Sequence, residues 1–468
     1  MAQCEVGSPS FNLSQLTDSA LVSSICSPFI GMEINKDAFC ISFLTKSLLP
    51  RIKDKIKEID TESFKFIPEM AKLTIDNFGD EGLQIIHTSV LSEIINAIHL
   101  SGTKYTSIYI DLYRDTACRI PSKYRDQYVA KQIKTLAVSN DYKDRTLAAT
   151  LIPIVSNTEL VVAQFHTLSL DRVDYVCAAI VDILPKCSLD ENVVSYVLTN
   201  AANDNSEIVK QRVADVFGCI APKNLELFAQ VLNDASAGRF AVRSIPQIAV
   251  ANGISAIENL FKVAADNYPV ESGAALFDMV KGASKEDQPI LIQFTKMLIK
   301  NVTFVWHLYE LSELFEDKEP FFEFLSPAKA KDWRLRYALQ IQTQKFIPIF
   351  GARLLNYVLR YSGDLVAIIR DGSAPLWAEL IPYGQAIVDK LLWLSTKGFK
   401  ARIIVTKAIV LYGIKPKFMD LAKKFAVDPV SNVRYCLASR LAEQNEKELF
   451  QELFGNNNDP DIKALKML

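Results

Sequence analysis

A small polar residue recurs six positions before a basic residue along this chain, at a nearly constant interval. From Arg336, the basic members follow at steps of 34, 32, 32 and 29 residues. The pairs are Ser139/Arg145, Ser206/Arg212, Asn233/Arg239, Asp364/Arg370, Thr396/Arg402, Asp428/Arg434 and Asn457/Lys463. Between Arg145 and Arg212 a weaker pair, Asp171/Cys177, fills the gap. A period of thirty-odd residues is typical of proteins built from stacked helix pairs.

The segments within each period are amphipathic and helical in their spacing. Examples are "RVADVFGCIA" (212–221) and "AIVDKLLWLS" (386–395), whereas alternating strand-like patterns are nearly absent. One helix pair cannot bury both of its apolar faces, so neighbouring pairs must stack. We therefore predict an all-α fold, a curved α-solenoid of about 12–13 repeats of antiparallel helix pairs.

Each polar and basic pair has a predicted structural role. The Asp, Asn, Ser or Thr can cap or turn the chain between the two helices. The basic residue then enters the second helix, where its charge can meet an acidic turn of the adjacent repeat. We expect Arg336, Arg370, Arg402 and Arg434 to form such a ladder rather than partner contacts, although Arg402 could do both.

Bulk properties support an elongated array and exclude several classes of protein. At 468 residues the chain exceeds the roughly 250–300 residues of a single hydrophobic core. Its 52 Lys and Arg residues nearly balance 54 Asp and Glu residues, which argues against a wholly basic nucleic-acid-binding surface. Only 17 glycines are present, too few for a protein built on many hairpins or phosphate loops.

The motif search predicts neither a catalytic site nor a cofactor or metal. The four histidines lack metal-ligand spacing, and H-E-x-x-H, G-x-x-x-x-G-K-[ST] and G-x-S-x-G are all absent. The eight cysteines form no C-x-x-C pair and favour a reduced compartment. No apolar run of about 18 residues occurs, and residues 1–30 lack the basic start of a signal peptide. We expect a cytoplasmic protein, with the nucleus also open.

Five segments of the last third carry more specific motifs. They are "AKAKDWRLRYAL" (328–339), "GDLVAIIRDG" (363–372), "GFKARIIVTKAIVLYG" (398–413), "AVDPVSNVRYCLASRL" (426–441) and "NDPDIKAL" (458–465). In this order and spacing they resemble the final HEAT repeats of the scaffold subunit of protein phosphatase 2A. The resemblance covers residues 327–468, whereas the upstream sequence resembles HEAT repeats only in general.

That resemblance implies a non-catalytic scaffold with two sides. Residues 327–468 would hold the phosphatase catalytic subunit, and the HEAT-like repeats of residues 1–326 would hold a regulatory B-type subunit. The catalytic-subunit side would be a ridge of turns between paired helices. Carried over by position, the ridge residues are Trp333, Arg334, Val366, Phe399, Arg402, Val430 and Ser431.

The chain also departs from the family pattern. Asp332 replaces a lysine, Ala367 replaces a tyrosine, and Lys400 and Ala401 replace leucine and histidine. Gly372 and Pro375 fall inside a predicted second helix, which they should kink or delay. The sequence assigns no residues to the regulatory side and does not frame the repeats in 1–50 and 250–325.

Two residue-level interpretations and two alternative functions remain open. Trp333, between Asp332 and Arg334, is predicted to be exposed at its turn and to act as a binding anchor. "FFEFL" (321–325) is either a repeat core or the lip of a groove. The competing function is a cargo-binding or transport adaptor, although the four tryptophans form no repeat-by-repeat array. An unrecognised enzyme is a third class, which a closed cleft with converging titratable groups would favour.

Overall fold

The computed structural model describes residues 48–465 except 66 and 415, so the predictions for residues 1–30 lie outside it. No strand occurs among these described residues, and helices alternate along the chain with short turns. The predicted all-α helical-repeat fold is confirmed. The described residues divide into two compact units after Ala251.

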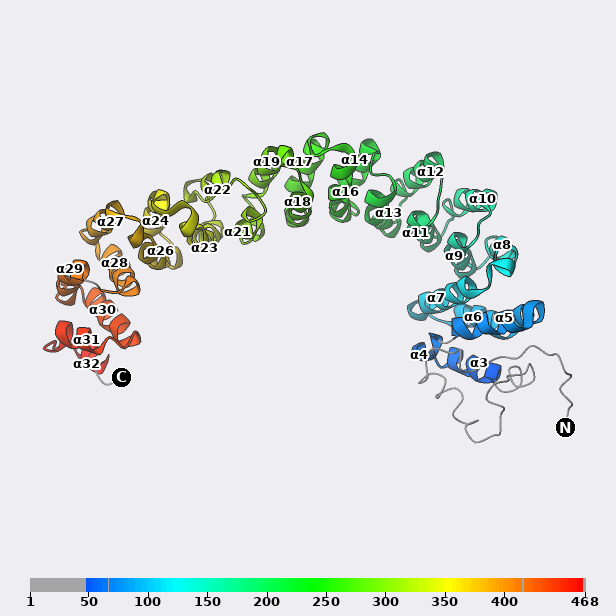
Figure 1. Cartoon of the computed structure of the whole chain (residues 1–468), viewed down its shortest axis with the longest axis horizontal. Coiled ribbons are helices and arrows are strands. Elements are labelled where there is room, and N and C mark those ends of the chain that lie inside the picture. The colour runs from blue at the N-terminus through cyan, green and yellow to red at the C-terminus, as the bar shows by residue number, and fades with distance from the viewer. Residues whose placement is uncertain (1–47, 66, 415, 466–468) are drawn as a thin grey trace, which may run out of the picture. The chain divides into compact units, whose positions relative to one another are not determined.

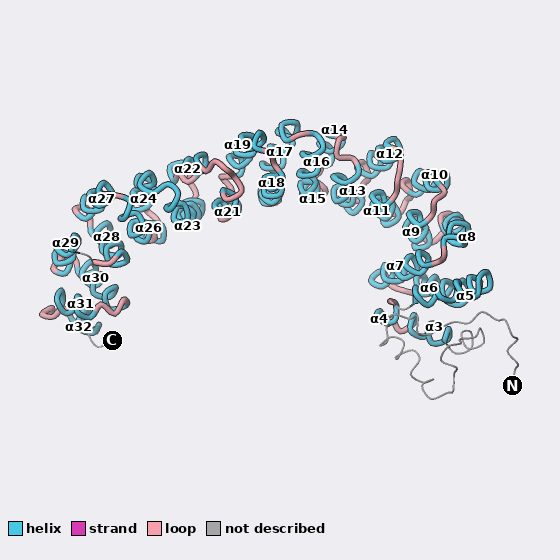
Figure 2. The backbone as a smooth tube through the Cα atoms, viewed as in Figure 1, coloured by secondary structure: helices cyan, strands magenta, loops and turns pink. Residues whose placement is uncertain are grey.

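In the first unit, successive helices alternate between two layers (Figures 1 and 2). The first-helix layer includes α8, α10, α12 and α14, and the second-helix layer includes α7, α9, α11 and α13. The helices are α3 (Leu49–Lys57), α4 (Thr61–Phe64), α5 (Ile67–Ile86), α6 (Ser92–Leu100), α7 (Thr103–Arg119), α8 (Ser122–Leu136), α9 (Tyr142–Leu151), α10 (Thr158–Leu168), α11 (Asp174–Ile183), α12 (Glu191–Ala202), α13 (Glu207–Ile220), α14 (Leu225–Asn233), α15 (Gly238–Ala241) and α16 (Ile245–Asn252).

The second unit repeats this arrangement. Its second-helix layer includes α23, α26, α28, α30 and α32, each packed on the next. The helices are α17 (Glu258–Asn267), α18 (Pro269–Gly282), α19 (Gln288–Leu298), α20 (Val302–Val305), α21 (Leu308–Ser312), α22 (Glu319–Phe324), α23 (Trp333–Phe350), α24 (Leu355–Ser362), α25 (Ala367–Asp371), α26 (Ser373–Leu380), α27 (Gln385–Ser395), α28 (Phe399–Tyr412), α29 (Pro416–Ala426), α30 (Ser431–Glu443), α31 (Lys447–Phe454) and α32 (Pro460–Leu465).

An aspartate organises the turn that leads into many of the second helices. Asp428 Oδ1 accepts a hydrogen bond from the Val430 N–H at 2.8 Å, and Asp364 Oδ1 accepts one from the Val366 N–H at 2.9 Å. These bonds satisfy backbone donors that a helix start leaves without an intrahelical partner. The aspartates therefore perform the predicted turn-forming role.

The same aspartates receive a basic side chain from the preceding repeat. Arg402 Nε and Nη2 donate to the two carboxylate oxygens of Asp428 at 2.7 and 3.0 Å. The other links are Arg145–Asp171 (2.6 Å), Lys210–Asp234 (2.8 Å), Arg336–Asp364 (2.7 Å) and Arg434–Asp459 (2.9 Å). The predicted ladder between neighbouring repeats is thus present, and we call these links the ladder.

Most ladder arginines also close their own turn. Arg145 Nη1 donates to the carbonyl of Ser139, and Arg434 Nη1 donates to that of Asp428, in each case six residues back. This contact explains the six-residue spacing that the sequence shows. Each guanidinium therefore fixes the turn behind it and the next repeat's turn, because its planar fork directs N–H donors to both, which the single ammonium of a lysine cannot match.

The ladder stabilises the ionised aspartates. Burial alone would raise the pKa of Asp171, but hydrogen bonds from Arg145 and the Val173 N–H hold that pKa below its usual value. The pKa of Asp428 is lowered in the same way by Arg402 and the Val430 N–H. The side chains of Arg145 and Asp171 are only 9% and 8% exposed, so removing one partner would leave the other charge largely buried.

Two of the sequence-predicted pairs are wrong. Arg212 lies within α13, 49% exposed, with Nε 3.6 Å from Asp182. The ladder cation of this repeat is instead Lys210, six residues after Asp204, and Ser206 caps nothing with its side chain. The pair Asn233/Arg239 is also wrong. Asn233 is the last residue of α14, and the next residue, Asp234, is the turn aspartate.

The ladder is interrupted where a partner is missing. Cys177 stands at an arginine position, and its thiol lies 3.1 Å from the Asp171 carbonyl, so it closes its own turn without reaching the next repeat. Arg370 closes its turn on the carbonyl of Asp364, but the following turn offers Thr396 in place of an aspartate, so the predicted ladder role of Arg370 is wrong. The Arg370 Nε lies 3.5 Å from Asp371 and makes no hydrogen bond there.

Helix pairs continue through the middle of the chain, where the sequence repeat is weak. The described turns between these helices lack the ladder contact. Only Tyr268 separates α17 from α18, so no turn exists to carry an aspartate. The second helix after α14 is broken, because α15 is one turn long and a 3-10 segment precedes α16. The faint repeat pattern there reflects different connections between helices rather than a different fold.

The predicted break at Gly372 and Pro375 is confirmed. Helix α25 ends at Asp371, and α26 begins at Ser373. A Cβ at Gly372 would lie 2.8 Å from the Ile368 carbonyl, so the close approach there requires glycine.

Replacing Arg145 with methionine should destabilise the first unit by about 3 kcal/mol, because Asp171 would keep a buried charge without its partner. Arg212→Met is the matched control and should change stability by less than about 0.5 kcal/mol, because Arg212 is exposed. Native-state hydrogen exchange of the α9 and α11 amides measures both effects. Equal effects of the two substitutions would contradict the ladder assignment.

Candidate protein-binding surfaces

In each repeat a short turn leads into the second helix. In the last repeats of the second unit, these turns lie along one edge. Ladder links join the turn before α25 to Arg336 of α23, the turn before α30 to Arg402 of α28, and the turn before α32 to Arg434 of α30. The turn before α28 lies in the same row of turns, because α26 packs on α28. We call this edge, residues 331–334, 363–368, 396–402 and 427–431, the turn ridge.

The turn ridge carries an exposed apolar side chain at each of its four turns. Trp333 is 44% exposed, Leu365 95%, Phe399 39% and Val427 76%. Single exposed apolar residues are ordinary, but their recurrence at successive turns forms a row. This row makes the turn ridge a candidate contact surface.

All seven sequence-predicted residues lie on this ridge with accessible or half-buried side chains, and six of them take no part in the ladder. Trp333 is the first residue of α23, directly after its N-cap Asp332, and the Arg334 guanidinium lies 5.9 Å from the Trp333 ring centroid. The remaining accessible members are Val366 and Val430, both half-buried N-caps, and Phe399 and Ser431, each the first residue of its helix. The predicted exposure of Trp333 at its turn is confirmed.

The seventh residue, Arg402, faces a different partner. Two of its donors are held by Asp428 and a third by the Lys397 carbonyl. Its guanidinium is therefore part of the ladder, which was the favoured role of this arginine. The binding role of all seven residues stays a prediction.

Sequence reasoning missed Leu365 and Val427. Each is adjacent to a turn aspartate, Asp364 or Asp428. An apolar residue beside a capping aspartate could have signalled an exposed contact, because the capped turn places its neighbours in solvent.

The charges left accessible on the turn ridge are mostly positive. Asp364 and Asp428 are neutralised in the ladder, whereas no ion pair holds Lys331, Arg334 or Lys400 among the described residues. Beside the ridge, the ammonium groups of Lys390 and Lys397 lie 4.1 and 4.4 Å from the Trp393 ring centroid. The surface thus combines apolar anchors with cations, a composition common at binding hot spots.

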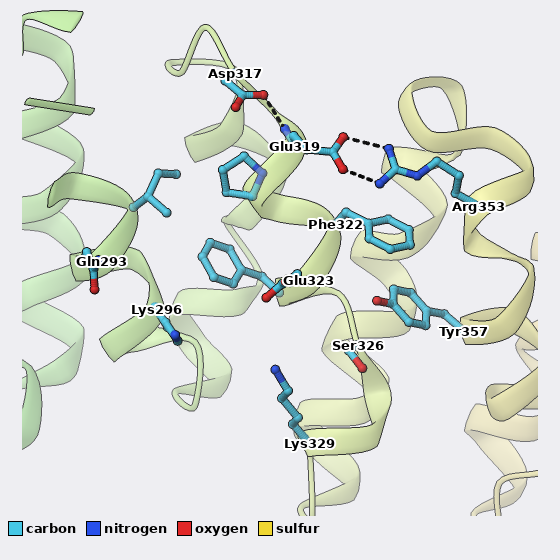
Figure 3. Close-up of a pocket in the computed structure, with 13 residues that line it drawn as sticks. Gln293, Lys296, Asp317, Glu319, Phe322, Glu323, Ser326, Lys329, Arg353 and Tyr357 are labelled. Atoms are coloured by element: carbon cyan, nitrogen blue, oxygen red, sulfur yellow. Dashed lines mark hydrogen bonds and ion pairs between the residues drawn. The ribbon is translucent and has the colours of Figure 1, made fainter. Parts of the chain in front are cut away.

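A second surface feature is a hollow of about 750 Å³ in the first-helix layer of the second unit (Figure 3). It lies among α19, α22 and α24, and the six-residue length of α22 leaves it open. The Phe322 ring stacks on Tyr357 at 5.1 Å, and the Arg353 guanidinium lies 4.4 Å from the Phe322 centroid. Both oxygens of Glu319 bind Arg353, which lowers the pKa of Glu319.

The residues of "FFEFL" (321–325) can now be assigned to the repeat core or to the lip of a groove. Phe321 is fully buried in the core, whereas Phe322 and Phe324 line the hollow. The segment is therefore both a repeat core and a groove lip. Lys296 and Lys329 line the same hollow from α19 and from the segment before α23 (Figure 3).

Three further observations concern residues 48–465. No helix described there has both the length and the apolar character needed to cross a membrane. Within the same range, no cluster of three or more His, Cys, Asp or Glu side chains could hold a metal. Cys118, Cys177, Cys187, Cys219 and Cys436 are free thiols.

Comparison with known proteins gives a structural likeness only. No protein-family model matches the chain, and no curated protein sequence matches it. The structure of Kap121p covers 96% of this chain at 13% identity with a TM-score of 0.53. A mutant of Kap121p covers 82% at 14% identity (TM-score 0.42), and a homology model of the full-length AP-3 complex in an intermediate open conformation covers 96% at 12% identity (TM-score 0.35).

The likeness to Kap121p bears on the fold. The chain is an all-α helical-repeat solenoid. It spans 55% of the Kap121p chain, 42% of the mutant chain and 81% of the AP-3 chain. The helical-repeat part of the sequence resemblance is supported, whereas the resemblance to a phosphatase scaffold in particular stays a prediction.

Two tryptophans of the second unit test the assignment of the ridge. Trp333→Ala should change the free energy of unfolding by less than about 0.5 kcal/mol, because the side chain is exposed. Trp377→Ala is the matched control and should cost about 3–5 kcal/mol. The Trp377 ring is fully buried and its Nε1 donates to Ser362 Oγ at 2.8 Å. Denaturant unfolding measures both, and a large loss for Trp333→Ala would place that ring in the core.

Proposed function

We propose that this chain is a non-catalytic adaptor that binds a folded protein partner through the turn ridge. The observation that carries this proposal is the row of Trp333, Leu365, Phe399 and Val427, exposed at four successive turns. Packed helices lie about 8–10 Å apart, so four turns extend over roughly 30 Å. This length suits one face of a globular partner rather than a small ligand.

The fold favours a transport or cargo adaptor as the kind of protein. Its support is the likeness to Kap121p, a karyopherin, over nearly the whole of this chain. In this interpretation the partner is a cargo protein, and the chain contributes binding energy without chemistry. The cations Lys331, Arg334 and Lys400 favour a cargo whose contact surface is acidic.

A phosphatase scaffold is the second candidate, favoured by a different observation. The five motifs of residues 327–468 resemble the scaffold of protein phosphatase 2A in order and spacing. On this candidate function the turn ridge holds the phosphatase catalytic subunit, and residues 1–326 hold a regulatory subunit. Joining the two on one chain would raise their effective concentration to the millimolar range.

One experiment tests the ridge and separates the two partner classes. Tagged full-length chain and a Trp333→Ala, Phe399→Ala double variant are used to capture proteins from cell extract, and each captured protein is then purified and titrated. The double variant should bind the partner at least about 30-fold more weakly, which corresponds to about 2 kcal/mol. A phosphatase catalytic subunit would identify the scaffold, and a protein that is carried between compartments would identify the transport adaptor.

The matched control is Leu100→Ala, Val138→Ala in the first unit, where the two side chains are 88% and 81% exposed. This control removes exposed apolar surface of a similar kind away from the ridge. It should leave the affinity of the ridge partner unchanged. Retention of that partner by the ridge variant, or equal loss in the control, would contradict the proposal.

A further inference from the structure

A groove of about 690 Å³ crosses the second-helix layer of the first unit, separate from the turn ridge. It is lined by α7, α9, α11 and α13, which lie side by side in Figure 1, together with Arg125 of α8. Its volume falls in the range of ordinary ligand and peptide sites. The partner proposed for the turn ridge does not account for this groove.

The floor of the groove consists of small and apolar side chains. It includes Ala178 and Ala179 of α11 and Thr146 and Thr150 of α9. The hydroxyl groups of Thr146 and Thr150 donate to carbonyls of their own helix, each at 2.8 Å. The threonine hydroxyls therefore need no outside partner, and small side chains between larger neighbours leave room for apolar groups of a bound segment.

The rim of the groove is cationic. Four cations line it, Arg114, Arg125, Lys186 and Arg212, against the two carboxylates of Asp111 and Asp182. The Arg114 guanidinium binds Asp111 at 2.7 Å and Asp115 at 3.0 Å, so its charge is balanced. The contacts of Arg212 with Asp182 and Asp215 are long, at 3.6 and 3.9 Å, and Arg212 is half exposed.

Arg125 is the clearest sign of an unfilled interaction. Its Nη1 donates to the Cys118 carbonyl at 3.3 Å, but its buried Nε has no hydrogen-bond partner. A buried guanidinium donor without a partner is costly, and a carboxylate with its two oxygens is the group that best satisfies it. The nearby Lys186 is exposed and adds a second cation to this rim.

We propose that this groove binds an acidic protein segment whose apolar side chains rest on the alanine and threonine floor. Carboxylates flanking those side chains reach Arg125, Lys186 and Arg212 on the rim. The groove crosses four helices about 8–10 Å apart, or roughly 30 Å, which accommodates a helix of about 20 residues. An amphipathic helix that lays its apolar face in a hydrophobic groove is a recurring mode of peptide recognition.

The test uses two fluorescein-labelled synthetic peptides of 20 residues with leucines at i, i+3, i+4 and i+7. The remaining positions are mostly glutamate in one peptide and mostly lysine in the other. Fluorescence anisotropy with the full chain should show at least about tenfold tighter binding of the glutamate peptide. Equal affinities, or no binding of either peptide at about 100 µM protein, would overturn the proposal.

Variants locate the binding in the groove. The Lys186→Glu, Arg212→Glu double variant should reverse the preference between the peptides, and Ala179→Phe should weaken binding at least about tenfold by filling the floor. Lys134→Glu, Lys223→Glu is the matched control, because both lysines are exposed in the first unit outside the groove. Thermal unfolding shows whether each variant is folded. If Ala179→Phe does not fold, the charge-reversal variant alone tests whether the peptide binds in the groove.

Three outcomes would assign the groove to another occupant and overturn the proposal. Displacement of the glutamate peptide by single-stranded RNA at low salt would identify a nucleic-acid site. A tenfold gain in peptide affinity on deleting residues 1–47 would identify a segment of the chain itself. Dimer formation that the glutamate peptide reverses would identify a second copy of this chain.

Discussion

The paired contact between a basic side chain and the next repeat's turn aspartate is the interaction that joins neighbouring repeats wherever the turn aspartate recurs. A solenoid has no single core, because each helix pair contacts only its neighbours. The relative placement of neighbouring repeats must then come from contacts between them. Arg402 shows how this is done, since it bonds the Lys397 carbonyl of its own turn and both carboxylate oxygens of Asp428. The hydrophobic faces supply the stacking energy, and the ladder fixes the register.

The ladder also determines the character of the exposed surface. Because Asp364 and Asp428 are neutralised within the turns, the accessible charges beside Trp333 and Phe399 are mainly those of lysine and arginine. The same turns leave apolar residues exposed to solvent, at Leu365 beside Asp364 and at Val427 beside Asp428. One local motif therefore joins neighbouring repeats and presents a combined apolar and cationic surface.

The ladder was predicted correctly from the sequence where the same turn geometry recurs. The prediction was wrong where the connection between the two helices differs. Arg145, Arg402 and Arg434 were recognisable because each guanidinium needs a fixed distance to its own turn. Lys210 was missed because Arg212, two residues away, fits the same loose pattern but lies on another face of α13. The exposure of Trp333 followed from its turn position. The groove was not predictable, because Arg125 meets the floor of Ala178 and Thr150 only when the helices are stacked.

The natural gap in the ladder offers the most direct test of this account. Arg370 has a buried Nε without a hydrogen bond, and Thr396 occupies the place of the turn aspartate. The measurement is native-state hydrogen exchange of the amides in residues 396–400 for wild type, Thr396→Asp and the uncharged control Thr396→Asn. The account predicts that Thr396→Asp slows exchange about tenfold relative to Thr396→Asn, which corresponds to about 1.4 kcal/mol. Exchange as fast in the aspartate variant as in the asparagine variant would contradict the central role of the ladder.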